Sequence, residues 1–202
     1  MTGACVAEQG KLMRVIGGAA KGRRLSVPKG QSVRPTAARV KESLFNILPR
    51  DFSGKRVLDL FAGTGNLSIE ALSRGADHAL LIDASARSAA AIKLNLRRLG
   101  LAAHSAVWVA PVARSLRVLA RRKERFDFIF LDPPYDKGLA GRSLEIIAQC
   151  QLLCSTGTLV VEHSARESVK PRYDSLQLHD QRRYGDTLLS FYARTTEINS
   201  AP

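Results

Sequence analysis

Three aspartates, Asp59, Asp83 and Asp132, stand at or beside the ends of short apolar runs that are typical of buried strands. In an open parallel sheet the carboxyl ends of the strands meet at one edge, and ligands bind there. We therefore expect these carboxylates to gather at one edge of a sheet. Such a cluster suits a ligand with amino and hydroxyl groups, because carboxylates accept hydrogen bonds from both.

The segment Asp132-Pro133-Pro134-Tyr135 follows the apolar run 126–131 and combines a carboxylate, a rigid turn and an aromatic ring. The prolines have no N–H group and a fixed φ, so carbonyl groups in this segment point outward as acceptors. An exocyclic amino group of a nucleobase could donate to Asp132 and to the Pro133 carbonyl while the base stacks on Tyr135. By itself, the tetrapeptide could also be a proline-capped strand exit without chemistry.

A second segment, residues 56–72, predicts a strand, a glycine turn and a helix. Gly63 and Gly65 permit positive φ in the turn, and the start of the helix offers unpaired N–H groups. A dinucleotide-binding turn would need a third glycine where this chain has Ser68. Asp59, just before the turn, would repel a pyrophosphate but hold an α-amino group. The pattern favours a cationic ligand over a dinucleotide.

The third acid, Asp83, ends the short apolar strand 78–82 and lies 18 residues beyond Gly65. From this position a carboxylate can accept hydrogen bonds from both hydroxyls of a ribose. A ligand with an amino acid end, a ribose and no phosphate corresponds to S-adenosylmethionine. The alternative is that Asp83 only caps the helix predicted for residues 85–99, because aspartate is a favoured N-cap.

With these motifs the chain resembles the class I S-adenosylmethionine-dependent methyltransferases, in which residues 59–65 would be the cofactor motif and 132–135 the amino-methylating motif. Within that class it is similar to the RsmD family, which methylates the N2 of a guanine in 16S ribosomal RNA. The resemblance runs from about Met13 to Arg194. It is carried by several segments in order: Arg34-Pro35-Thr36, 39–48, 70–76, 162–164, 183–187 and 190–192.

The resemblance implies an α/β, Rossmann-like class I methyltransferase fold: a seven-stranded, mostly parallel sheet with helices on both faces, plus a small N-terminal β-hairpin and helix. It implies S-adenosyl-L-methionine as cofactor and S-adenosyl-L-homocysteine as product. The implied cofactor-binding residues are Asp59, Phe61, Ala62, Gly63, Thr64, Gly65, Asp83, Ala84, Ala110 and Asp132. The implied catalytic residues are Asp132, Pro133, Pro134 and Tyr135, without a metal.

One position departs from the family pattern. Relatives carry an acid after the fourth strand that meets the adenine amino group, whereas this chain has Ala110-Pro111 there. We expect backbone groups near Ala110 to take over that contact.

The hydrophobic pattern predicts a basic hairpin, a helix over 36–48, and then strands alternating with helices at Val57, Leu80, Val107, Phe128 and Val160. Two final strands are expected over 175–179 and 188–192, joined through 182–186, and by the resemblance the second is an antiparallel seventh strand. We expect a disordered lead-in over 1–12, the basic hairpin and helix over 13–50, and the methyltransferase domain over 51–202.

The formal charge is +13, from 31 lysines and arginines against 18 acids, so an acidic polymer is the expected partner. Residues 1–50 carry ten of the bases and two acids, and a hairpin over 13–28 would present a cationic tip at 21–24. The predicted RNA-binding residues are Lys21, Arg23, Arg24, Arg34, Thr36 and Arg39. A second run, 114–125, has six bases and could be either a solvated face or an RNA surface.

We expect the three cysteines to be reduced thiols that form neither a disulfide framework nor a metal site; they are Cys5, Cys150 and Cys154. We expect His163 to have a structural role. No apolar run reaches 18 residues and no signal-peptide core is visible, so we expect a cytoplasmic protein without a membrane partner.

The expected partner is 16S rRNA within a small-subunit assembly intermediate, and the expected oligomeric state is a monomer. Two other functions stay open: DNA adenine-N6 methylation, and RNA binding by a non-catalytic assembly factor.

Overall fold

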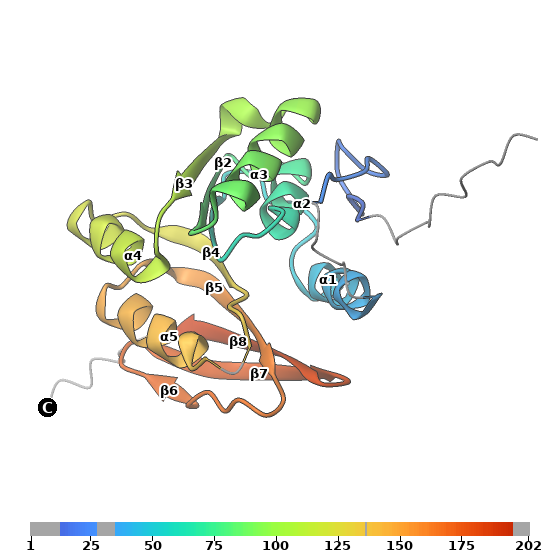
Figure 1. Cartoon of the computed structure of the whole chain (residues 1–202). Helices are drawn as coiled ribbons and strands as arrows, with labels where there is room; N and C mark the ends of the chain where they lie inside the picture. Colours follow the sequence, from blue (N-terminus) through green and yellow to red (C-terminus); the bar gives the residue numbers. More distant parts are fainter. Residues whose placement is uncertain (1–12, 28–34, 136, 196–202) are drawn as a thin grey trace, which may run out of the picture.

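The computed structural model describes residues 13–27, 35–135 and 137–195, which build one eight-stranded sheet with helices on both faces (Figure 1). The strand order is β3-β2-β1-β4-β5-β8-β7-β6. In chain order the elements are α1 (Pro35–Ile47), β1 (Arg56–Leu60), α2 (Asn66–Ser73), β2 (His78–Asp83), α3 (Ala86–Arg98), the 3₁₀ turn η1 (Ala102–His104), β3 (Ser105–Val109), α4 (Val112–Arg121), β4 (Phe126–Leu131), α5 (Leu139–Gln149), β5 (Leu153–Ser164), β6 (Arg172–Tyr173), β7 (Leu176–Tyr184) and β8 (Thr187–Arg194).

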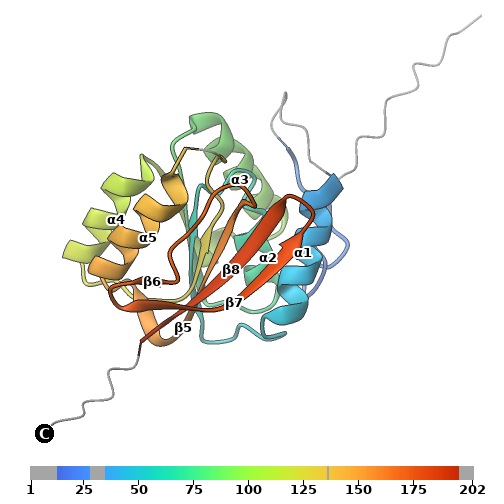
Figure 2. The ribbon, with the colours of Figure 1, turned by 90° about the horizontal axis from the view of Figure 1, so that it is seen from below.

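The sheet has two hydrophobic cores, one on each face. The first holds apolar residues of α1, α2 and α3 together with Val15 and Leu25 from the chain before α1. The second holds those of α4 and α5, including Leu116 and Leu144. Figure 2 shows α4 and α5 on one side of the strands and α1 and α2 on the other. Strands β1, β2 and β4 are buried between these layers, as their apolar runs predict.

The predicted alternation of strands and helices is confirmed, since β1 to β5 are parallel and β8 pairs antiparallel with β5. The strand count is eight and not seven, because the two-residue strand β6 pairs with β7. Residues 182–184, expected in the connection, extend β7 instead. Tyr184 pairs with Thr187, and Gly185 with φ 62° forms the two-residue turn together with Asp186.

The N-terminal arm, residues 13–27, is not the regular hairpin that the sequence predicts. Its two sides share a single antiparallel bridge, between Arg14 and Arg24. Three hydrogen bonds also join them, from Val15 N–H to the Arg23 carbonyl (3.0 Å), from Gly22 N–H to the Val15 carbonyl (2.8 Å) and from Leu25 N–H to the Met13 carbonyl (2.9 Å). The chain reverses over residues 17–22, so the predicted tip at 21–24 is wrong. The reason is that the N–H groups of Ile16, Gly17, Ala19 and Ala20 donate to Glu70 and Ser73 on α2 instead of pairing across the arm.

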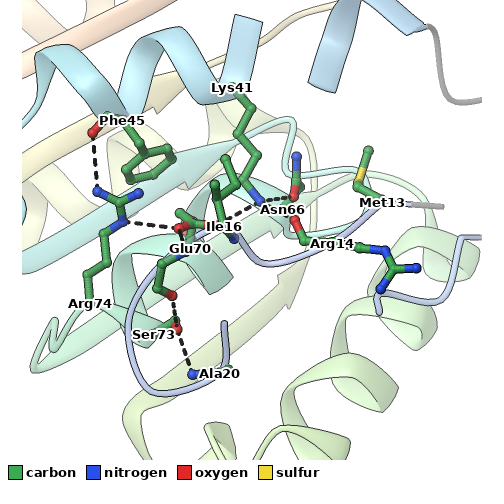
Figure 3. A network of polar contacts seen from close by, with 12 residues as sticks. Met13, Arg14, Ile16, Ala20, Lys41, Phe45, Asn66, Glu70, Ser73 and Arg74 are labelled. Atoms are coloured by element: carbon green, nitrogen blue, oxygen red, sulfur yellow. Dashed lines mark hydrogen bonds and ion pairs between the residues drawn. The ribbon is translucent and has the colours of Figure 1, made fainter. Parts of the chain in front are cut away.

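Glu70 on α2 holds the N-terminal arm in place (Figure 3). Its side chain is fully buried, and its two oxygens accept hydrogen bonds from Ile16 N–H (2.8 Å) and Gly17 N–H (2.7 Å). The same carboxylate forms ion pairs with Lys41 (2.9 Å) and Arg74 (3.0 Å). Removing one partner of a buried ion pair costs about 3–5 kcal/mol, because the other charge is left unpaired.

Ser73, one turn further along α2, completes the docking of the arm. Its hydroxyl accepts from Ala20 N–H (2.9 Å) and donates to the Gly17 carbonyl (2.6 Å). A side chain at Gly18 would place its Cβ 1.7 Å from the Ser73 carbonyl oxygen, so only glycine fits there. The predicted boundary at residue 50 stays a prediction, although the arm and α1 share one core with the sheet. The predicted disordered lead-in, 1–12, lies outside the described residues.

Candidate functional site

Asp59, Asp83 and Asp132 lie at the carboxyl edge of three neighbouring strands, as predicted. The order β2-β1-β4 makes the strands adjacent, and Leu60 is level with Ile82 on one side and Leu131 on the other. Asp83 is the last residue of β2, and Asp132 follows β4 directly. Parallel pairing in this register is what brings three acids that are distant in sequence to one edge.

A cavity opens at this edge, beside α1 and the start of α2. It is lined by both predicted motifs, the glycine turn from β1 and Asp132 from β4, and by residues of the arm and of α1. The lining residues are Met13, Val40, Lys41, Leu44, Asp59, Phe61, Ala62, Gly63, Thr64, Asn66, Leu67, Asp132 and Glu162.

The turn after β1 has an unusual backbone. Phe61, Gly63 and Gly65 have φ values of 61°, 56° and 75°, and for Phe61 this left-handed conformation costs about 1–3 kcal/mol. A Cβ at Gly65 would lie 3.0 Å from the Leu81 side chain, so this glycine permits close packing. A Cβ at Gly63 would meet nothing nearer than 3.9 Å, so ligand atoms can approach the backbone there.

Asp59 is buried beneath this turn and lines the cavity. It accepts a hydrogen bond from Ser68 N–H (3.2 Å). Burial is the main cause that raises the pKa of Asp59 to about 7, and the nearby charge of Asp83 contributes to this rise. A cationic group entering the cavity would favour the ionised carboxylate, so the site fits an α-amino group.

Asp83 organises the turn at the end of β2. Its carboxylate accepts from Gly63 N–H (2.8 Å) and from Ser85 N–H (2.7 Å). The alternative that Asp83 is the N-cap of α3 is wrong, because Ser85 is the N-cap and accepts from Ser88 N–H (3.2 Å). Each carboxylate oxygen has a second lone pair, so Asp83 can still accept from ribose hydroxyls. Ala84, the next residue, is exposed.

Ala110 follows β3 at the same edge. Its N–H donates to the Asp83 carbonyl (3.1 Å), so this donor is already in use. A contact between Ala110 and an adenine therefore has to come from another atom, and its place in the cofactor site stays a prediction.

Tyr135 is not among the residues that line the cavity, but its hydroxyl group donates to Glu162 Oε1 on β5, which does line it (3.0 Å). The same hydroxyl lies 3.2 Å from the Thr187 hydroxyl on β8. Burial raises the pKa of Tyr135, and the negative charge of Glu162 adds to this, so the phenol stays protonated. A ring held in this way can support a flat ligand beside Asp132. Pro133 is buried and Pro134 exposed between them.

Glu162 and Lys41 line the cavity but were not among the predicted site residues. Glu162 carries the same signal as Asp132, an acid near the carboxyl end of a buried parallel strand. Lys41 carried no such signal, because a lysine on a helix is ordinarily solvated. Its ammonium group donates to the Arg14 carbonyl (2.9 Å) and to Asn66 Oδ1 (2.6 Å), and burial lowers its pKa.

The predicted RNA-binding residues that the structure describes lie on the arm and on α1, and their role in RNA binding stays a prediction. Lys21, Arg23, Arg24 and Arg39 are exposed, whereas Arg34 and the side chain of Thr36 lie outside the described residues. The tip of the arm bonds to Ser73 at the carboxyl end of α2, and α2 starts at the cavity and runs about 12 Å away from it. The expectation that the tip projects beside the strand ends is therefore wrong.

Other candidates have structural roles. His163 is buried and bonds to the Ser190 hydroxyl (2.8 Å) and the Glu167 carbonyl (2.9 Å), which confirms the structural prediction. Cys150 and Cys154 are free thiols, and Cys5 lies outside the described residues. Among the described helices, none is both long and apolar enough to cross a membrane.

Comparison with known proteins gives consistent matches over almost the whole chain. The family model described as "Conserved hypothetical protein 95" matches residues 13–193. "Putative rRNA methyltransferase YlbH" of Bacillus subtilis is 40% identical over 182 residues, which cover 90% of this chain and 99% of that protein. "Ribosomal RNA small subunit methyltransferase D" of Escherichia coli K12 is 32% identical over 188 residues, 93% of each chain.

A solved structure of similar fold is "Putative methyltransferase yhhF from Escherichia coli", with a TM-score of 0.78 and 31% identity. The match covers 92% of this chain and 99% of that one. A more distant solved structure is "SMU.776, a putative methyltransferase complexed with SAH", where SAH is S-adenosylhomocysteine. Its identity to this chain is 18% and its TM-score is 0.64, so it supports the fold alone.

Proposed function

The chain belongs to the RsmD family of S-adenosylmethionine-dependent rRNA methyltransferases, and from this premise we propose that it methylates the exocyclic N2 of a guanine in 16S rRNA. From the resemblance to the family we propose guanine 966 as the target nucleotide. The observation that carries the proposal is the single cavity lined by both the Asp59–glycine turn and Asp132. One pocket therefore offers a place for a methyl donor and a place for an amino group beside it.

The residues on the β1 and β2 side fit S-adenosylmethionine, which supplies an activated sulfonium methyl group when bound. Asp59 would hold the α-amino group, and Asp83 would accept from the ribose hydroxyls. The backbone at Gly63 is open to close approach and fits the amino acid end. We propose these roles, together with contacts from Phe61, Ala62, Thr64 and Gly65.

The residues on the β4 and β5 side fit the methyl acceptor. The lone pair of a guanine N2 is delocalised into the ring, so the main task of the protein is orientation. Hydrogen bonds from the amino group to Asp132 and to the Pro133 carbonyl would favour a pyramidal nitrogen whose lone pair faces the methyl group. Tyr135 would hold the plane of the base. The nitrogen becomes acidic only after methylation, so its proton can leave late to Asp132 or to water.

The substrate must present the guanine outside its stack, because a stacked base cannot enter a pocket at the edge of a sheet. We propose that the substrate is 16S rRNA in a small-subunit assembly intermediate and that the enzyme acts as a monomer. A cytoplasmic location stays a prediction.

The test is methyl transfer from labelled S-adenosylmethionine to naked 16S RNA and to isolated assembly intermediates, followed by nucleoside analysis. We expect label in N2-methylguanosine, with the higher rate on the assembly intermediate. Label in N6-methyladenosine of DNA would instead support the adenine alternative. RNA binding without transfer to any substrate would support the non-catalytic assembly factor.

A further inference from the structure

The segment Ala84–Lys123 has no aspartate or glutamate in 40 residues but contains nine lysines and arginines. It builds α3, η1, β3 and α4, and we call it the cationic edge. Each of its basic side chains is exposed to solvent. They are Arg87, Lys93, Arg97, Arg98, Arg114, Arg117, Arg121, Arg122 and Lys123. By contrast, residues 124–194 contain ten acids and nine bases, so their charges nearly cancel.

The fold gathers these charges around one end of the sheet. β3 is the edge strand, with α3 packed on one face of the sheet and α4 on the other. Figure 1 shows both helices beside β3, at the end of the sheet opposite β6. Basic residues that belong to two layers therefore surround a single edge strand.

The solvent-facing side of α4 is the clearest part of this surface. Val112, Ser115, Leu116 and Leu119 are buried, and the spacing of Arg114, Arg117 and Arg121 places their side chains together on the opposite side of the helix. Among the described residues, none accepts a hydrogen bond or forms an ion pair with these three side chains.

Two exposed arginines elsewhere in the protein do have acidic partners. Arg56 pairs with Glu124 (2.6 Å) and Arg182 with Asp180 (2.9 Å). Like charges one turn apart on a helix repel each other. The arginines of α4 therefore carry a repulsion that an anionic partner from outside would relieve.

The cationic edge starts at the carboxyl edge of the sheet, where the cavity opens, and leads away from it. α3 begins three residues after Asp83, and α4 begins two residues after Ala110, whose N–H bonds to the Asp83 carbonyl. Arg114 thus lies in the first turn of α4, near the carboxyl edge. Arg121 lies about 10 Å further along the helix. The sugar-phosphate backbone of an RNA whose base occupies the cavity can follow Arg114, Arg117 and Arg121 along α4.

We propose that the cationic edge binds the sugar-phosphate backbone of the substrate RNA at nucleotides outside the target base. This inference rests on the proposed function, because it takes rRNA as the substrate of the neighbouring cavity. Phosphate contacts of this kind orient the RNA without reading its sequence. The tip of the docked arm lies at the far end of α2, whereas the cationic edge starts at the carboxyl edge of the sheet, where the cavity opens.

The test compares two double variants that remove the same charge from different places. Arg117→Gln with Arg121→Gln removes two cations of α4, and Arg50→Gln with Arg172→Gln removes two exposed cations outside the cationic edge. The readout is the dependence of 16S RNA affinity on salt, measured by filter binding. We expect the first variant to lower the slope of log affinity against log salt by about 1.5, at roughly 0.7–0.9 for each lost phosphate contact.

The control variant should keep the wild-type slope, and both variants should bind S-adenosylhomocysteine with wild-type affinity, which shows that they are folded. An equal loss in both variants would mean that total charge matters and not this surface. An unchanged slope in the α4 variant would likewise overturn the proposal. The cationic edge would then be a candidate binding surface for another partner, such as an acidic protein.

Filter binding needs no turnover, so the two proposals can fail separately. If the α4 variant shows the predicted lower slope but the wild-type protein does not methylate 16S RNA, the proposed reaction is wrong and the proposed RNA surface is supported. If it methylates the RNA but the α4 variant binds with the wild-type slope, only the surface fails.

Discussion

The two sides of the cavity use acidic residues in different ways. Asp59, on the β1 side, is 2% exposed and has a pKa raised by burial to about 7. Asp132, at the end of β4, is exposed to solvent. A buried acid with a raised pKa suits a cationic ligand that restores its charge. An exposed acid suits a base that arrives from solvent and leaves again. Single substitutions should therefore separate donor binding from methyl transfer.

The largest effect is expected for Asp132→Ala. If Asp132 accepts from the amino group of the base, its loss should lower the single-turnover rate by about 100- to 1000-fold, the range for one lost polar contact to the reacting group. Affinity for S-adenosylhomocysteine, measured by calorimetry, should stay unchanged. A variant with the wild-type rate would remove Asp132 from the reaction, and a large loss of affinity would place it on the donor side.

Asp83→Ala is the matched change on the donor side. It removes the proposed acceptor for the ribose hydroxyls, so affinity for S-adenosylhomocysteine should fall by about 1.5–3 kcal/mol. It also frees the N–H groups of Gly63 and Ser85, so the melting temperature should fall. Ser85→Ala is the control, since it removes the N-cap of α3 but keeps the carboxylate. Equal loss of affinity in both variants would show that Asp83 acts only through the fold.

Asp59 predicts a pH dependence of donor binding. Its raised pKa means that it is partly protonated below pH 7, and a bound α-amino group requires the ionised form. Affinity for S-adenosylhomocysteine should therefore rise with pH up to about 7, by at most about tenfold per pH unit. Calorimetry in buffers of different ionisation enthalpy should detect the proton released at pH 6. Proton release that is the same in Asp59→Asn would exclude this residue as its source.

Asp59 also affects the stability of the ligand-free protein, which should fall as pH rises, whereas donor affinity should rise. Between its ordinary pKa of 3.8 and about 7 the folded protein holds the proton of Asp59 more tightly than the unfolded chain. The free energy of unfolding of the ligand-free protein should thus decrease as pH rises through this interval. Asp59→Asn should be less sensitive to pH there, as measured by urea unfolding. An identical slope in both proteins would contradict the raised pKa.

The smallest effect is expected for Tyr135→Phe, which keeps the ring and removes the hydroxyl that joins Glu162 and Thr187. The loss of these contacts should weaken RNA binding or methyl transfer by about 0.5–1.5 kcal/mol. Tyr135→Ala, which also removes the ring, should lose about 1–3 kcal/mol by loss of stacking. Equal effects of the two substitutions would mean that the hydroxyl contacts matter and the ring does not.

The sequence by itself determined the parallel strands and the edge at which their acids meet. Apolar runs of five or six residues that end at a turn are typical of strands buried within a parallel sheet. Asp59, Asp83 and Asp132 then reach one edge because parallel strands share a direction. For the same reason the glycine turn and the proline turn could be assigned to a common ligand site before any contact was known.

The tertiary structure decided what closes the cavity and where the basic residues face. Glu70 bonds to Ile16 and Gly17, more than 50 residues away in sequence. No local pattern marks such a pair, because a glutamate on a helix is ordinarily solvated. These contacts turn the tip of the arm away from the strand ends. The sequence left the basic run 114–125 open as either a solvated face or an RNA surface, and only the fold showed that α4 lies beside β3, at the edge that carries Asp83.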